Sequence, residues 1–252
     1  MSGVTLTIVS LLPRLQNTNG DAQNAAVLAA RATWAGLDAR VVDVDRRDAL
    51  PERVDAIVLG SGSDSSLEAT RGTLLTMHDE LRTWGTEGVP ILAVGTGWEL
   101  LSWGIELADG SAVEGLGVLP GRAVPRADRV TGDLVVSSPR FGTLVGFENH
   151  ARDYVGAEGS PLGRVRAGSG NGRDAGQEGV VMGSVIGTHL HGPVLAKNPS
   201  FADALLGIAS ERARLEYRPG ERTAIVDGYA AAAREAQLSA AGVALSASGP
   251  RA

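Results

Sequence analysis

Two histidines, His189 and His191, are separated by one residue and are the first candidates for chemistry in this chain. Side chains two residues apart on a strand project from one face, so the pair could serve in proton transfer or bind a metal ion. No further ligand lies at a recognisable metal-site spacing. We therefore favour a histidine for acid–base chemistry and predict no metal. We expect His150 to be a structural, hydrogen-bonded residue.

A sharp turn at Gly95 could position a nucleophile. Residues 89–94 predict a strand, residues 95–97 a turn and residues 98–101 the start of a helix. A side chain at such an elbow lies beside free backbone N–H groups at the positive end of a helix, where a thiol ionises readily and an oxyanion is stabilised. Gly95 has no side chain, and the sequence contains no cysteine. A plain turn is the alternative interpretation, here and in the glycine-rich loop that begins at Gly60.

Thr96 has the hydroxyl nearest to the elbow. A histidine-activated threonine is a conceivable nucleophile. Thr96 and Glu99 also have the T-x-x-E spacing of a capping box, in which the hydroxyl and the carboxylate satisfy free N–H groups of the first helical turn. We favour the capping box, which would hold the elbow without doing chemistry.

The elements that must position these residues follow from periodicity. Short apolar runs alternate with helical patterns in the first hundred residues, and this alternation predicts an α/β fold with a mostly parallel central sheet and helices on both faces. The expected strands are 4–10, 39–44, 55–59 and 89–94, and the expected helices are 21–35, 67–86, 201–213 and 223–241. Beyond about residue 115 the pattern changes to short β-like runs. Ligands of such sheets bind at the carboxyl ends of the strands. We expect a single domain over residues 1–238 and a flexible tail over residues 239–252.

Composition excludes several classes of protein. The 252 residues are 43% hydrophobic and 21% charged, which is typical of a globular protein. The net charge of −6 disfavours nucleic-acid binding. The lack of cysteine excludes disulfides, thiolate metal sites and thiol catalysis. No stretch resembles a membrane span or a signal peptide, so we expect a cytoplasmic location. Neither glycine-rich loop matches a nucleotide-binding fingerprint, and no cofactor is predicted.

Several motifs together resemble the GatD family, a cobyric-acid-synthase-like branch of the class I glutamine amidotransferases. The resemblance covers most of residues 4–217 and is most specific in GFENH at 146–150 and in GTHLHGP at 187–193. Further matches are Gly20-Asp21 with Asn24, the loop 60–64, PLG at 161–163, Gly170-Asn171 and Lys197-Asn198-Pro199. The resemblance implies the flavodoxin-like fold of this class.

The resemblance also implies a set of site residues. The family elbow is similar to Cys-Gly-Gly-Tyr-Gln-Leu-Leu, which places Gly95 at the nucleophile position, and residues 95–101 differ from it at four of the seven positions. The catalytic histidine of the family corresponds to His191. Arg129 stands where the family uses an arginine near the glutamine, and Gly60 or its neighbours would supply oxyanion amides.

The function implied by the resemblance is that of a GatD subunit. Such a subunit forms a heterodimer with a Mur-ligase-like MurT partner, and the complex amidates the glutamate of the peptidoglycan precursor lipid II. Because glycine offers no atom for covalent catalysis, we predict that this chain does not form a thioester with glutamine. Two alternatives stay open: a non-catalytic scaffold or amino-acid-binding protein that retains the glutamine pocket, and a glutaminase with a non-cysteine nucleophile.

Overall fold

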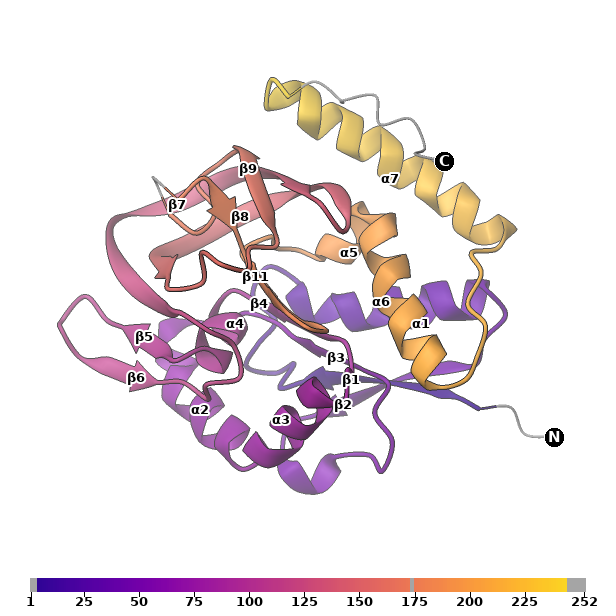
Figure 1. Ribbon diagram of the computed structural model, residues 1–252, viewed down its shortest axis with the longest axis horizontal. Coiled ribbons are helices and arrows are strands. Elements are labelled where there is room, and N and C mark those ends of the chain that lie inside the picture. Colours follow the sequence, from indigo (N-terminus) through magenta and orange to yellow (C-terminus); the bar gives the residue numbers. More distant parts are fainter. Residues whose placement is uncertain (1–3, 173–174, 244–252) are drawn as a thin grey trace.

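A six-stranded sheet that carries the predicted strands forms the centre of the molecule (Figure 1). The structure is a computed structural model, which describes residues 4–172 and 175–243. The strands of this sheet are β1 (Leu6–Leu11), β2 (Ala39–Val44), β3 (Ala56–Leu59), β4 (Ile91–Val94), β11 (Val180–Met182) and β12 (Val185–Thr188). Their order is β11-β12-β4-β3-β1-β2, and every pairing is parallel except that of β11 with β12.

Helices cover both faces of this sheet, as the alternation of strands and helices predicts. On one face, Ile8 of β1 packs in a buried cluster with Leu28 of α1 (Asn24–Trp34) and Leu205 of α6 (Pro199–Arg212). On the other face, Val9 packs in a cluster with α2 (Leu67–Leu75), α3 (His78–Thr86) and α4 (Thr96–Leu101). Successive side chains of a strand point to opposite faces, so β1 contributes to both clusters. The predicted α/β fold with a mostly parallel sheet is confirmed.

The single helix expected over residues 67–86 is wrong, because the chain forms α2 and α3 with a break between them. The backbone leaves the helical conformation at Met77, whose φ is −116° and ψ is 15°. The Met77 side chain is fully buried in the core beneath the break. The Thr76 hydroxyl donates a 2.7 Å hydrogen bond to the carbonyl of Thr73. Threonine hydroxyls compete in this way with the helical hydrogen-bond ladder, and core packing of Met77 fixes the break.

A second, largely antiparallel six-stranded sheet stands over one end of the first. Its strands are β5 (Gly104–Glu106), β6 (Ala112–Glu114), β7 (Arg122–Ser138), β8 (Gly142–Val155), β9 (Gly163–Ala167) and β10 (Gln177–Glu178). The long hairpin of β7 and β8 dominates this sheet, and its register shifts between Pro125 and Val130. The shift falls beside Arg129, so this irregularity re-aims the backbone at a residue of interest.

The C-terminal helix α7 (Glu221–Ala240) lies on the outside of the molecule (Figure 1) and contacts both helix α1 and the β7–β8 hairpin. In its first half, Asp227 forms an ion pair with Arg31 of α1, with 2.6 Å between Oδ1 and Nη1. Near its end, Arg234 donates a 2.6 Å hydrogen bond to the Thr143 carbonyl of β8, and Gln237 donates one of 2.8 Å to Asp133 of β7. From residue 244 on, the predicted tail 239–252 lies outside the described residues.

Four short helices complete the described chain. They are the single-turn elements η1 (Asp21–Gln23), η2 (Arg47–Ala49) and η3 (Asp64–Ser66), and the α-helix α5 (Val194–Lys197). Within the described residues, none of the helices has the length and apolar character needed to cross a bilayer.

Candidate functional site

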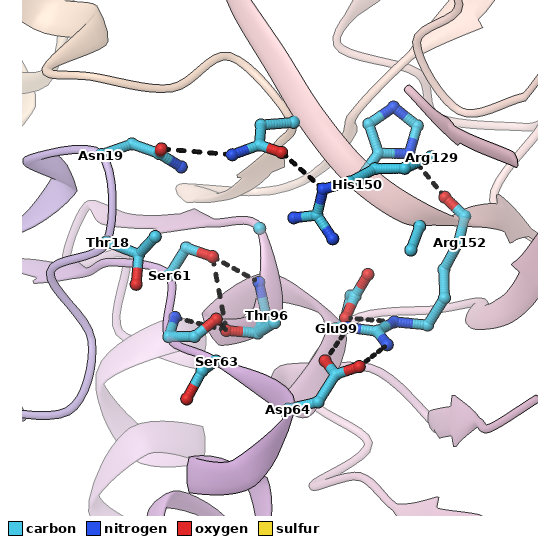
Figure 2. A pocket seen from close by; sticks show the side chains of 14 residues that line it. Thr18, Asn19, Ser61, Ser63, Asp64, Thr96, Glu99, Arg129, His150 and Arg152 are labelled. Atoms are coloured by element: carbon cyan, nitrogen blue, oxygen red, sulfur yellow. Dashed lines mark hydrogen bonds and ion pairs between the residues drawn. The ribbon is translucent and has the colours of Figure 1, made fainter. Parts of the chain in front are cut away.

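A cavity of about 290 Å³ opens where the loops after β1, β3 and β4 meet the β7–β8 hairpin (Figure 2). This is the position expected for a ligand site in a parallel sheet, at the carboxyl ends of neighbouring strands. The residues that line it are Thr18, Asn19, Ser61, Gly62, Ser63, Asp64, Gly95, Thr96, Glu99, Arg129, Asn149, His150, Ala151 and Arg152. The structure therefore brings Gly95 and Arg129, both singled out from the sequence, to one cavity.

Gly95 forms the predicted elbow between β4 and α4. Its φ of 53° and ψ of −125° lie in a region that residues with a side chain rarely adopt. A Cβ atom built on Gly95 would lie 2.8 Å from Cε1 of His191. A side chain at this position would therefore begin beside the imidazole of His191.

His191 is oriented by a buried carboxylate. Its Nδ1 lies 2.8 Å from Oδ2 of Asp21 in η1, and the other oxygen of Asp21 accepts a 2.9 Å hydrogen bond from the backbone N–H of Gly192. Because a carboxylate accepts hydrogen bonds, Nδ1 carries the proton of this bond. Nε2 is buried and has no hydrogen-bond partner within residues 4–172 and 175–243. An Asp–His pair thus presents a free ring nitrogen at the elbow.

The placement of His189 and His191 on a strand is wrong, because β12 ends at Thr188 and both residues follow it. Each imidazole instead pairs with its own carboxylate: Nδ1 of His189 lies 3.3 Å from Oε2 of Glu178. Burial lowers the pKa of His189 to about 4, with the nearby His150 acting in the same direction. His189 is therefore neutral at pH 7. In the part of the chain that the structure describes, no group of three or more His, Cys, Asp or Glu side chains could hold a metal ion.

The capping box predicted for Thr96 and Glu99 is also wrong. The Thr96 hydroxyl accepts a 2.7 Å hydrogen bond from the backbone N–H of Gly62 and donates one of 3.0 Å to Oε1 of Gln16. It ties the loop after β3 to the elbow instead of capping α4. One bond draws the hydroxyl toward Gly62 in the loop after β3 and the other toward Gln16 in the loop after β1, and the described residues show no hydrogen bond between Thr96 and His191.

Glu99 belongs to a charged network with Arg152 and Asp64 at one side of the cavity (Figure 2). Arg152 lies 3.0 Å from Glu99 and 2.9 Å from Asp64. Burial raises the pKa of Glu99, although the charge of Arg152 opposes the shift. The hydrogen bond from Arg152 lowers the pKa of Asp64. Burial works to lower the pKa of Arg152, but the two carboxylates outweigh it and raise that pKa. The Glu99 carboxylate is therefore paired with Arg152 and does not cap the first turn of α4.

Arg129 and Asn149 form the opposite wall of the cavity. Nε of Arg129 donates a 2.8 Å hydrogen bond to Oδ1 of Asn149, whose amide nitrogen donates one of 3.3 Å to Oδ1 of Asn19. Arg129 is exposed, and its remaining donors are available to a ligand. A guanidinium beside amide groups suits a small ligand with a carboxylate.

Two further predicted residues have structural surroundings: His150 lines the cavity, and Gly60 precedes the loop that lines it. His150 Nδ1 lies 2.6 Å from the Arg152 carbonyl, as expected of a hydrogen-bonded structural residue, and the ring stacks on His189 at 4.1 Å between centroids. Gly60 directly follows β3, and a Cβ atom built on it would lie 2.1 Å from the carbonyl oxygen of Gln16. The backbone N–H of Thr96, next to the elbow, is directed at the Ser61 hydroxyl at 3.3 Å.

The sequence patterns indicate no role for the side chains of Asp21, Arg152 or Ser61. Asp21 follows the first predicted strand, and the rule that ligands gather at strand ends applies there as it does at residues 60 and 95. For Arg152 the sequence offers only a charged residue within an alternating strand pattern. Its partners lie 53 and 88 residues away, so no local spacing reveals them.

Comparisons with known proteins point to one family. The sequence model of the CobB/CobQ-like glutamine amidotransferase domain matches residues 8–199. The chain is 33% identical over 218 residues to the GatD subunit of the glutamine-hydrolysing lipid II isoglutaminyl synthase of Staphylococcus aureus, a match that spans 86% of this chain and 89% of that protein. The GatD subunit of Streptococcus pneumoniae is 30% identical over 211 residues, which span 82% of this chain and 81% of that protein. A crystal structure of a glutamine amidotransferase has a similar fold, with a TM-score of 0.56 and 21% identity over 80% of this chain and 98% of that one.

Proposed function

Because this chain belongs to the CobB/CobQ-like glutamine amidotransferase family, and within it resembles the GatD subunits, we propose that it is the GatD-type subunit of a two-protein amidating complex. Its partner would be a Mur-ligase-like protein of the MurT type, which activates a carboxylate with ATP. The complex would amidate the glutamate of lipid II in the cytoplasm, during peptidoglycan synthesis.

The observation that carries the chemical part of this proposal is the Asp21–His191 pair that faces Gly95. A glutaminase of this class needs a side chain at the elbow to attack the amide carbon, and in our proposal the cysteine of the relatives is replaced here by glycine. Without an attacking atom no acyl-enzyme forms. The chain would therefore dock on the ligase and deliver or admit ammonia, rather than release ammonia from glutamine.

The test is an amidation assay on the complex of this chain with a co-purified Mur-type ligase. We expect amidation of lipid II with ATP and ammonium chloride, and no amidation when glutamine replaces ammonium. Amidation that depends on glutamine would overturn the loss of hydrolysis. Failure of the two chains to co-purify would overturn the role as a subunit.

A second candidate function is amino-acid binding without catalysis, and the cavity wall favours it. Arg129 and Asn149 keep donors and an amide beside a cavity of amino-acid size. Calorimetry with glutamine and with glutamate tests this function on the isolated chain. Binding that is weakened in Arg129→Ala supports it, and the absence of heat with either amino acid rules it out.

A glutaminase that uses Thr96 as the nucleophile has less support. Its hydroxyl is held by Gly62 and Gln16 rather than by a general base. Ammonia release from glutamine that is lost in Thr96→Ala and His191→Ala would revive this alternative.

A further inference from the structure

We infer that Ser61 is a second determinant of the chemistry of this site, because its side chain fills the space that a side chain at position 95 would occupy. This inference rests on the proposed function in one respect, since it treats position 95 as the nucleophile position.

The geometry over Gly95 leaves no room for a side chain. A Cβ atom at this position would lie 2.5 Å from Oγ and 2.9 Å from Cβ of Ser61, as well as 2.8 Å from Cε1 of His191. All these separations are shorter than real Cβ contacts, so something must shift before any side chain fits. Gly95 is therefore a close-approach glycine as well as a turn glycine.

Hydrogen bonding holds Ser61 in this place. Its hydroxyl oxygen accepts the backbone N–H of Thr96 at 3.3 Å, and the backbone carbonyl of Ser61 accepts a 2.8 Å hydrogen bond from the N–H of Thr18. Ser61 is buried, so rotation of its hydroxyl away from the elbow would leave the Thr96 N–H without this partner. An unsatisfied buried donor is costly.

The same hydroxyl also occupies a position of catalytic value. The N–H of the residue after a nucleophile is the usual donor to the oxyanion of acyl transfer in elbow-type sites. Here that donor, the Thr96 N–H, is directed at Ser61. Ser61 thus blocks both the attacking position and the adjacent oxyanion donor. In this inference, positions 61 and 95 together remove the nucleophile and the free oxyanion donor, while the Asp21–His191 pair keeps its orientation.

The test restores a thiol at the elbow with and without space for it. Three variants of the full chain are compared: Gly95→Cys, Ser61→Gly/Gly95→Cys and Ser63→Gly/Gly95→Cys. Ser63 lies in the same loop, and its hydroxyl pairs with Ser65 at 2.8 Å instead of facing the elbow, so its replacement adds a glycine without opening the space. The measurements are the thermal midpoint and the rate at which iodoacetamide alkylates the thiol, between pH 5 and pH 9. In that reaction the thiolate sulfur bonds to the reagent carbon and iodide leaves.

We expect the Ser61→Gly/Gly95→Cys thiol to react on the order of tenfold faster at pH 7 than that of either other variant, because an accessible thiol at a helix N-terminus has a lowered pKa. We also expect this variant to recover about 2–4 °C of the midpoint lost in Gly95→Cys. If Gly95→Cys does not fold, the comparison of the two double variants decides. Equal midpoints and equal rates in the two double variants would overturn the inference. The assay needs neither ligase nor glutamine, so failure of the proposed amidating complex leaves its outcome interpretable.

Discussion

Nδ1 of His191 lies 2.8 Å from Oδ2 of Asp21, although the two residues are 170 positions apart in the sequence. Asp21 lies in η1, in the loop region that follows β1, and His191 follows β12, so this contact joins distant strands of the central sheet. Both side chains are almost completely buried. The pair therefore contributes to the fold as well as to the site, and the two contributions can be measured separately.

Asp21→Asn should destabilise the protein by about 1–3 kcal/mol, because an amide cannot accept both the His191 ring N–H and the Gly192 backbone N–H as the carboxylate does. Urea unfolding followed by circular dichroism measures the free energy of unfolding. Asp43→Asn, on the exposed side of β2, is the control and should change it by less than about 0.5 kcal/mol. Equal effects of the two substitutions would show that the Asp21 carboxylate has no special role.

The stability of the protein should fall as the pH drops from about 6.5 to about 4, because burial holds the pKa of His189 near 4 instead of 6.5. In this window the unfolded chain binds a proton that the folded chain refuses. The free energy of unfolding should therefore be about 3 kcal/mol higher above pH 6.5 than below pH 4 on account of His189. Urea unfolding at several pH values should show this slope, and His189→Asn should remove most of it.

His78→Asn is the matched control for the loss of a histidine, because His78 is only partly buried. It should keep the slope between pH 6.5 and pH 4. A slope that persists unchanged in His189→Asn would mean that another group carries the pH dependence.

Arg152→Met should destabilise the protein by about 3–5 kcal/mol, because it leaves the Glu99 carboxylate buried without its partner. Replacing the carboxylate as well, in Arg152→Met/Glu99→Gln, should recover most of this loss. Arg122→Met breaks an exposed ion pair with Glu106 and should cost less than about 1 kcal/mol. Urea unfolding measures all these stabilities. A double variant no more stable than Arg152→Met would contradict a stabilising ion pair between Arg152 and Glu99.

Arg129→Ala should weaken the binding of an amino acid by about 10- to 100-fold while leaving the thermal midpoint unchanged, because the guanidinium is exposed and its only protein partner in the described part of the chain is Asn149. Isothermal titration calorimetry with glutamate measures the affinity. Arg122→Ala, on the same strand but away from the cavity, is the control. Equal weakening by both substitutions would indicate a general charge effect instead of a site.

Four of the six strands of the central sheet, β1 to β4, and the elbow could be predicted from the sequence because they depend on local patterns. Each expected strand lies within one or two residues of β1, β2, β3 or β4, and Gly95 forms the turn between strand and helix. Buried parallel strands are short apolar runs, so burial and local sequence agree there. The sequence indicates the second sheet only through short β-like runs beyond about residue 115. Its strand pairings cannot be predicted, because they join residues that no local periodicity relates.

The remaining contacts of the site could not be predicted, because they join residues that are far apart in the sequence. The spacing of Thr96 and Glu99 fits a capping box, and the buried charge of Arg152 overrides it for Glu99. The histidine at 191 was expected, whereas its aspartate partner was assigned no role. Ser61 was read as part of a glycine-rich turn, because its contact with the elbow exists only once β3 and β4 lie side by side.

Helix α7 supports the wall of the cavity without lining the cavity. Of the described residues that line the cavity, none belongs to α7, yet the helix grips both strands of the hairpin that carries Arg129 and Asn149. Its other end is anchored to α1, which belongs to the central sheet layer. Helix α7 therefore adds, from the outer surface and away from the cavity, to the contacts that hold the β7–β8 hairpin against the central sheet layer.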